Sequence, residues 1–101
     1  MKKIIRGTTP TIQYTFNTVN VANIVAAILT IKRGNATVIE KDLSSATVGT
    51  KILTWKLSQE ETLSASGDAS MMLNWKLTDG TRGASAVTDV KFSPNYKDEV
   101  I

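Results

Sequence analysis

The chain has 101 residues, which is the length of one domain, so residues 1–101 are expected to form a single folded unit. It contains no histidine and no cysteine, which excludes disulfides, thiolate chemistry and catalysis by imidazole bases. The net charge of +3 is spread over many segments, whereas a nucleic-acid groove needs basic residues gathered into one stripe, so no nucleic-acid partner is expected.

The first strand is predicted at Thr11–Phe16, where polar and apolar residues alternate. A strand turns successive side chains to opposite faces, so Ile12, Tyr14 and Phe16 should share the buried face. Pro10 cannot donate a hydrogen bond to a neighbouring strand, which favours a strand start or an edge position.

A hairpin is predicted from Val25 to Lys41. Arg33-Gly34-Asn35 supplies the residues that a tight reversal needs, and Thr37–Lys41 returns as the second arm. Ile28 falls on the outward face of the first arm, where it is either covered by another layer or presented to a neighbour. The core face of the first arm is predicted to carry four residues: Val25, Ala27, Leu29 and Ile31.

The middle of the chain predicts a loop, a strand and a short helical turn. Leu43–Thr50 is rich in small and hydroxylated residues and should connect the strands on either side. Lys51–Leu57 alternates again and directs Trp55 inward. A hydroxyl ahead of two carboxylates caps the start of a helix, so Ser58–Glu61 should begin one helical turn that links the two sheets.

The second hairpin is predicted around Asp79-Gly80, a pair that favours the tight turn between two strands. Ala69–Leu77 alternates, with its large apolar residues, Trp75 among them, on one face. Ala84–Phe92 should form the returning arm, which ends at Pro94.

These elements amount to about six or seven short strands and one helical turn, which is typical of an all-β, antiparallel, immunoglobulin-like sandwich. A small barrel is the other option. Trp55 and Trp75 should anchor the core. No apolar run approaches the roughly 18 residues that a membrane span needs, so no membrane association is expected, and Met1–Ile5 is not followed by the apolar region of an export signal.

No catalytic set is found, so we predict that the chain is not an enzyme and has no catalytic, cofactor-binding or metal-binding residues. Without histidine, Ser66 or Ser85 would need a lysine or a carboxylate as its base, and no spacing suggests one. Glu60 and Glu61 diverge on a helical turn, and the acidic loop of a calcium site is missing.

The two ends of the chain are the candidate interaction segments. The terminal segments 1–9 and 95–101 can be extended: residues 2–6 are basic and β-prone, and residues 98–101 are acidic and apolar. Each end either forms an edge strand on its own domain or adds a strand to a neighbouring subunit. Opposite charges at the ends are expected to help copies pack head to tail into a homo-oligomer or multi-copy assembly. The candidate contact residues are Lys2, Ile4, Ile5, Arg6, Ile28, Tyr96, Asp98, Glu99, Val100 and Ile101.

Three segments carry a resemblance: Ile5–Thr11 (IRGTTPT), Leu57–Leu63 (LSQEETL) and Glu99–Ile101 (EVI), with the Asp79-Gly80 hairpin between the last two. In this order they resemble a group of small, mostly uncharacterised proteins of similar length that are encoded by tailed phages and prophages of gut and other Firmicutes-type bacteria. Glu99 departs from the group, which often has glycine there. The group offers no functional residues to carry over.

The resemblance implies a virion structural protein of the tail or baseplate, assembled in the host bacterial cytoplasm and packed in repeated copies against other virion structural proteins. A capsid decoration or head–tail connector protein is the close variant. A carbohydrate-binding module for host attachment is a further alternative, and it would need exposed aromatic rings for stacking. The inward phase of Tyr14 and Trp55 argues against that role for them and leaves Tyr96.

Overall fold

The computed structural model describes residues 2–101; Met1, part of the predicted segment 1–9, lies outside the described residues. Nine strands, one α-helix and two short 3-10 helices are assigned within this range. In chain order they are β1 (Lys2–Ile5), β2 (Thr11–Thr15), η1 (Val21–Asn23), β3 (Ile24–Arg33), β4 (Ala36–Asp42), η2 (Leu43–Ser45), β5 (Thr47–Val48), β6 (Ile52–Lys56), α1 (Gln59–Ser64), β7 (Gly67–Leu77), β8 (Arg82–Ala84) and β9 (Thr88–Ser93).

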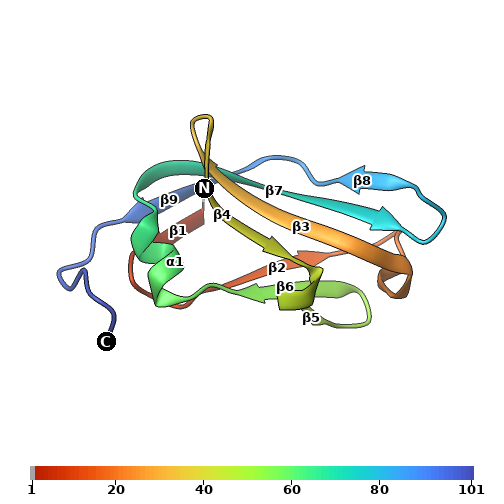
Figure 1. Cartoon of the computed structure of the whole chain (residues 1–101), viewed down its shortest axis with the longest axis horizontal. Coiled ribbons are helices and arrows are strands. Elements are labelled where there is room, and N and C mark those ends of the chain that lie inside the picture. The colour runs from red at the N-terminus through yellow and green to blue at the C-terminus, as the bar shows by residue number, and fades with distance from the viewer. Residues whose placement is uncertain (1) are drawn as a thin grey trace.

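The strands form two sheets that pack face to face (Figure 1). The large sheet has the order β1-β9-β7-β3-β4, with β8 also paired to β7, and the small sheet has the order β2-β6-β5. The pairing is antiparallel except between β1 and β9, which run parallel. The predicted all-β, immunoglobulin-like sandwich is confirmed.

Both predicted hairpin turns are present, with Gly34 and Gly80 at the positive φ angles of 62° and 88° that glycine adopts without strain. The returning arm of the second hairpin differs from the prediction, because it begins at Arg82 and is interrupted between β8 and β9. At the interruption the Leu73 N–H donates to Ser85 Oγ at 2.9 Å instead of to a backbone carbonyl. A side-chain hydroxyl thus replaces one backbone acceptor between the strands.

The core lies between the sheets and centres on Trp55, which is fully buried. Its Nε1 donates to the Asp42 carbonyl at 2.9 Å, so the indole also ties the small sheet to the end of β4. The Tyr14 ring meets the indole edge to face, with centroids 6.4 Å apart. Trp75 also faces inward but is only half-buried, and its ring stands perpendicular to that of Phe16 at 5.1 Å.

Val25 departs from the prediction that it faces the core, since 54% of it is exposed. The register between β3 and β7 shifts between Ile24 and Ala26, so β3 carries one extra residue there. Such a bulge reverses the alternation on one side of it. Ile24 and Ala27 therefore point inward, and both Val25 and Ala26 are left outside.

Gly83 of β8 lies against the Trp75 indole, and a Cβ at this position would come within 2.5 Å of the ring. Gly83→Ala is therefore expected to lower the free energy of unfolding by about 1–3 kcal/mol, because the ring must leave its packed position. Urea unfolding measures this loss. In a Trp75→Leu background the same substitution should cost far less, and an equal cost in both backgrounds would contradict the packing explanation.

α1 begins with the predicted cap and crosses from β6 in the small sheet to β7 in the large sheet. Ser58 Oγ accepts the Glu61 N–H at 3.1 Å, and Glu61 Oε1 accepts the Ser58 N–H at 2.9 Å. This reciprocal pair satisfies backbone donors that the first helical turn leaves free. The prediction of a capped helical turn between the sheets is confirmed.

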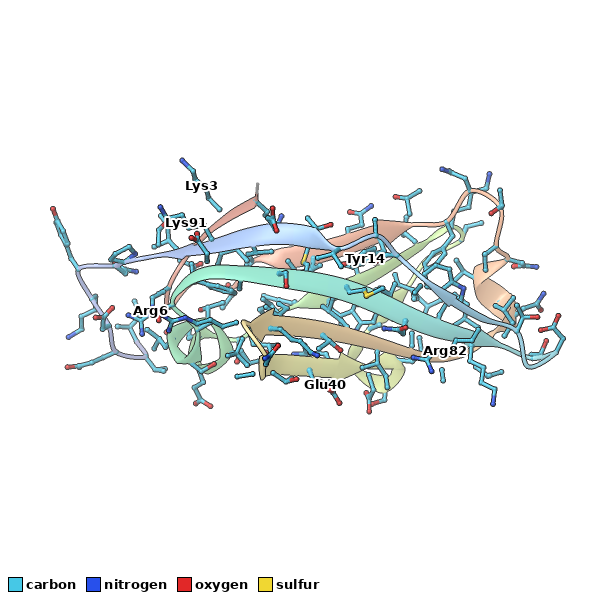
Figure 2. All side chains as sticks on the ribbon, turned by 90° about the horizontal axis from the view of Figure 1, so that it is seen from above. Lys3, Arg6, Tyr14, Glu40, Arg82 and Lys91 are labelled. Carbon is cyan, nitrogen blue, oxygen red and sulfur yellow. The ribbon has the colours of Figure 1, made fainter. Side chains whose placement is uncertain are left out.

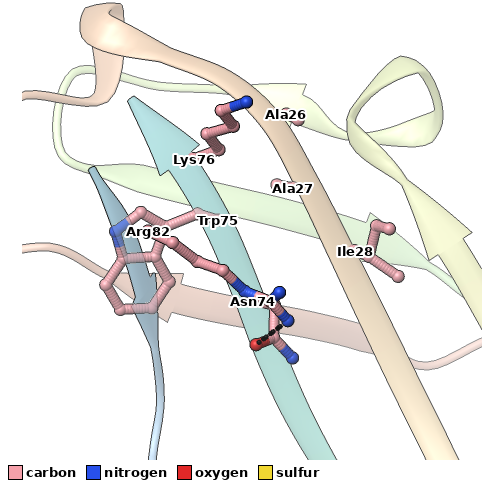
Figure 3. Close-up of a pocket in the computed structure, with 7 residues that line it drawn as sticks. All are labelled: Ala26, Ala27, Ile28, Asn74, Trp75, Lys76 and Arg82. Atoms are coloured by element: carbon pink, nitrogen blue, oxygen red, sulfur yellow. Dashed lines mark hydrogen bonds between the residues drawn. The ribbon is translucent and has the colours of Figure 1, made fainter. Parts of the chain in front are cut away.

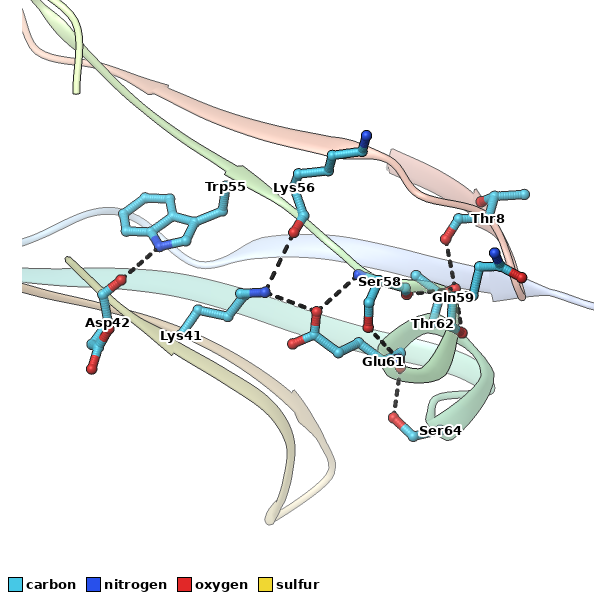
Figure 4. Close-up of polar contacts among 10 residues, drawn as sticks. All are labelled: Thr8, Lys41, Asp42, Trp55, Lys56, Ser58, Gln59, Glu61, Thr62 and Ser64. Atoms are coloured by element: carbon cyan, nitrogen blue, oxygen red, sulfur yellow. Dashed lines mark hydrogen bonds and ion pairs between the residues drawn. The ribbon is translucent and has the colours of Figure 1, made fainter. Parts of the chain in front are cut away.

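The same carboxylate fastens the edge of β4 to the helix (Figure 4). Lys41 Nζ donates to Glu61 Oε1 at 2.8 Å and to the Lys56 carbonyl at 3.3 Å. Burial alone would raise the pKa of Glu61, but the hydrogen bonds and charge of Lys41, with the Ser58 bonds, outweigh it and hold that pKa below its ordinary value.

Glu61→Gln is expected to lower the free energy of unfolding by about 1 kcal/mol at neutral pH, the usual magnitude for a lost cap. A carboxylate with a depressed folded-state pKa stabilises the fold above its unfolded pKa of about 4.3, and this contribution disappears as the pH falls through the folded pKa. The difference between wild type and variant should therefore shrink in acid. Denaturant unfolding of wild type and variant between pH 3 and pH 7 measures this difference. Glu60→Gln, at an exposed neighbouring position, is the control. A difference that does not change with pH would contradict the role given to the Glu61 carboxylate.

Candidate functional site

The helix α1 and both ends of the chain meet at one end of the sandwich (Figure 1). Thr62 is a fully buried polar residue of α1. Its Oγ1 donates to the Thr8 carbonyl at 2.8 Å and accepts the Gly7 N–H at 2.9 Å. Gly7 takes a φ of 83° that brings its amide to this hydroxyl. The first two segments that carry the sequence resemblance are thus in direct contact.

Arg6 closes the other end of the helix. Its Nε donates to the Ala65 carbonyl at 2.8 Å and one terminal nitrogen donates to the Leu63 carbonyl at 2.7 Å. These are carbonyls at and just beyond the C-terminus of α1, where a cation is favoured. The remaining terminal nitrogen lies 3.6 Å from Asp98 Oδ1, and the Arg6 carbonyl accepts from the Asn95 side chain at 2.9 Å.

The final residue completes the arrangement. The Gln59 side-chain amide donates to the Ile101 carbonyl at 3.0 Å, and its oxygen accepts the Ile101 N–H at 2.8 Å. All three segments of the resemblance therefore converge on one cluster, which we call the terminal junction: Arg6, Gly7, Thr8, Gln59, Thr62, Asp98 and Ile101. The polar groups of the terminal junction hydrogen-bond to each other and so attach both ends of the chain to α1.

The N-terminal segment forms an edge strand on its own domain. β1 pairs with β9 in parallel, with Lys2 opposite Val90 and Ile4 opposite Phe92. This pairing turns Ile4 into the core, where only 3% of it is exposed, so the prediction of Ile4 as a contact residue is wrong. Lys2 is exposed, and Ile5 is 52% exposed.

Residues 95–101 form no strand and fold back on the same chain. The ion pair between Arg6 and Asp98 forms within one chain. Head-to-tail packing of copies through the charged ends stays a prediction. Glu99 pairs with Lys97 at 3.2 Å. The apolar and aromatic candidates of this tail remain on the surface: Tyr96, Val100 and Ile101.

The remaining candidate, Ile28, occupies the outer face of the large sheet. It is 42% exposed although it lies on β3, which is hydrogen-bonded to a strand on both sides. Hollows surround it. One of about 210 Å³ is lined by Ala26, Ile28, Asn74 and Arg82 among others (Figure 3), and one of about 300 Å³ lies between Ile28 and Asp42.

A further hollow of about 310 Å³ lies along the same face beside Thr30 and Met72, and Val87, 61% exposed, forms part of its wall. The outward side chains of Ala26, Ile28, Thr30, Met72, Asn74 and Val87 are called the Ile28 face below. Only Ile28 is identifiable from the sequence, as the large apolar residue on the wrong phase of its strand. Ala26, Thr30 and Asn74 are small or polar and carry no such signal, and Met72 and Val87 were not singled out from the sequence.

Charged residues border the Ile28 face on the strands β4 and β8, which flank β3 and β7 in the sheet; Glu40 of β4 and Arg82 of β8 are labelled in Figure 2. On one side Arg82 of β8 donates to Asn74 Oδ1 at 3.2 Å, which lays its guanidinium beside the row that contains Ile28, and Lys76 lies next to it. On the other side β4 carries Glu40 and Asp42. The hydrogen bond from the Ser44 side chain lowers the pKa of Asp42, which keeps this carboxylate charged.

The aromatic residues behave as their phase predicts. Trp55 is fully buried, and the hydroxyl oxygen of half-buried Tyr14 is enclosed without a partner in hydrogen-bond geometry. Burial raises the pKa of Tyr14, which the nearby Ser85 hydroxyl opposes. That hydroxyl already accepts from Leu73 and donates to Ala86. Neither Tyr14 nor Trp55 presents a ring for stacking.

Within residues 2–101, no group of three or more acidic side chains is arranged to hold a metal ion. No helix in the same range is both long and apolar enough to cross a membrane.

The crystal structure of CopC from Methylosinus trichosporium OB3b is similar to this chain, with a TM-score of 0.60 and 13% sequence identity over 95% of this chain and 86% of that chain. No family model matches the chain, and no curated protein matches it. Similarity at this level of identity shows the sandwich fold alone. CopC is not a phage protein, and this match contradicts the prediction of a virion structural protein. The resemblance to phage-encoded proteins stays a prediction.

Proposed function

We propose that the chain is a non-catalytic protein-binding module that presents the Ile28 face to a protein partner. The observation that carries this proposal is the exposure of Ile28 on an internal strand of the large sheet, with a hollow on each of two sides of it. An apolar centre bordered by charged residues is the usual organisation of a protein interface.

The dimensions of the face suit a protein partner. β7 has 11 residues and therefore spans about 36 Å at roughly 3.3 Å per residue. Four neighbouring strands, β4, β3, β7 and β8, lie about 4.8 Å apart, which gives a width of about 15–20 Å. The resulting area is of the order of the 800 Å² per partner found in standard interfaces.

Rigidity also favours this face over the tail of the chain. β3 and β7 each pair with strands on both sides, so their side chains are held in place before a partner arrives. Preorganised contacts lose little conformational entropy on binding. Tyr96, Val100 and Ile101 are exposed as well, but they lie on a segment without regular secondary structure.

Selection of peptides from a random library on the immobilised chain tests the proposal. Backbone amide shifts of the labelled chain then locate the bound peptides. We expect the shifts to cluster on β3, β7 and β8, and we expect Ile28→Glu to abolish binding. Val48→Glu is the matched control, because Val48 is 57% exposed on the small sheet and should not matter. Peptides that bind the terminal junction, or that tolerate Ile28→Glu, would overturn the proposal.

A further inference from the structure

We infer that the partner of the Ile28 face is a second copy of this chain, packed face to face about a two-fold axis. This inference rests on the proposed function and adds the identity of the partner. A two-fold contact requires a surface that is complementary to itself. The Ile28 face meets this requirement around its apolar centre, where Glu40 and Asp42 of β4 lie on one side and Lys76 and Arg82 lie on the other.

The strand order defines how two such faces align. Across the face lie β4, β3, β7 and β8. A two-fold axis that runs along the strands between β3 and β7 places β4 of one copy over β8 of the other. It also places β3 over β7, so that Ile28 of each copy lies over the polar and apolar side chains of Asn74 and Met72 in the other.

In this arrangement opposite charges of the two copies meet within single rows of residues that are paired across neighbouring strands. Asp42 is paired in register with Ile28, and Ile28 is paired with Asn74. The Arg82 guanidinium is bound to Asn74 and so lies beside the same row. An axis along the strands keeps each row at its own height, so Asp42 of one copy faces Arg82 of the other, with Glu40 one row farther along.

A second charge match lies at the other end of the face. Lys32 of β3 is paired with Ser70 of β7, and Ser70 is paired with Asp89 of β9. The same axis lays Lys32 of one copy over Ser70 of the other, next to Asp89. Each copy therefore offers a base next to an acid of the other copy at both ends.

Sedimentation velocity on the wild-type chain from about 5 µM to about 1 mM tests the inference. We expect a reversible dimer with a dissociation constant on the order of 10⁻⁵–10⁻⁴ M, weaker at high salt because the bordering charges are exposed. Ile28→Glu should raise the dissociation constant at least about tenfold, equivalent to roughly 1.4 kcal/mol, and Val48→Glu should leave it unchanged. A chain that stays monomeric throughout, or a dimer that is insensitive to Ile28→Glu, overturns the inference.

Exchanging an acidic and a basic residue between the two borders tests which side chains pair across the dimer. Asp42→Lys and Arg82→Glu should each weaken the dimer by about three- to tenfold, and the double exchange should restore most of the affinity, because these two side chains face each other in the proposed orientation. Additive weakening in the double variant overturns the proposed orientation. If peptides still bind the Ile28 face while the wild-type chain remains monomeric, the second copy is excluded and the protein-binding function stands. If neither occurs, both fail.

Discussion

Trp55→Ala is expected to lower the free energy of unfolding by about 3–5 kcal/mol, because the substitution removes the largest fully buried side chain and leaves a cavity between the sheets. It also leaves the Asp42 carbonyl without the indole donor that it accepts from at 2.9 Å. Denaturant unfolding followed by far-ultraviolet circular dichroism measures the loss without depending on tryptophan emission.

Two further variants separate the causes of this loss. Trp55→Phe keeps an aromatic ring but removes the donor, and it should cost about 1–2 kcal/mol beyond the smaller ring volume. Trp75→Ala should cost less than Trp55→Ala, because Trp75 is only half-buried. A loss below about 1.5 kcal/mol for Trp55→Ala would contradict its place at the centre of the core.

The second large effect is expected at Arg6. Arg6→Ala removes the donors to the Leu63 and Ala65 carbonyls and the ion pair with Asp98, and it should lower the free energy of unfolding by about 2–3 kcal/mol. Arg6→Lys should recover less than half of this, because an ammonium group cannot match the planar fork of a guanidinium. Thermal and urea unfolding measure both variants.

Arg33→Ala is the control for removal of an arginine as such, because Arg33 makes one exposed hydrogen bond, to Ser66 at 2.9 Å. It should change the free energy of unfolding by less than about 0.5 kcal/mol. Full stability of Arg6→Lys would show that charge alone suffices at this position. Peptide binding by folded Arg6→Ala should equal that of wild type, since the terminal junction is structural in this account.

Alternation in the sequence was sufficient to place most of the core. Ile12 and Trp55 face inward as predicted, because each lies in a strand whose period is undisturbed. Ser58 was recognisable because a helix start has a local chemical signature. The bulge at Val25 was not predictable in the same way, since an uninterrupted apolar run looks the same in either phase.

The terminal junction needed the three-dimensional fold. Arg6 and the carbonyls that it binds are separated by 57 and 59 positions, and Asn95 binds Arg6 across 89. No local pattern specifies such contacts. The proposed binding surface could be predicted only in part. Alternation in the strand shows that Ile28 points outward, but the acidic and basic borders depend on the order in which β4, β3, β7 and β8 lie in the sheet.

The outer face of the large sheet, with Ile28 at its centre, is proposed as the surface through which this chain binds a second copy of itself. Backbone amide shifts of the uniformly labelled wild-type chain, compared between dilute and concentrated solution, test this proposal most directly. We expect concentration-dependent shifts on β3, β7, β8 and the acidic end of β4. Shifts confined to β1, α1 and residues 95–101 would contradict it.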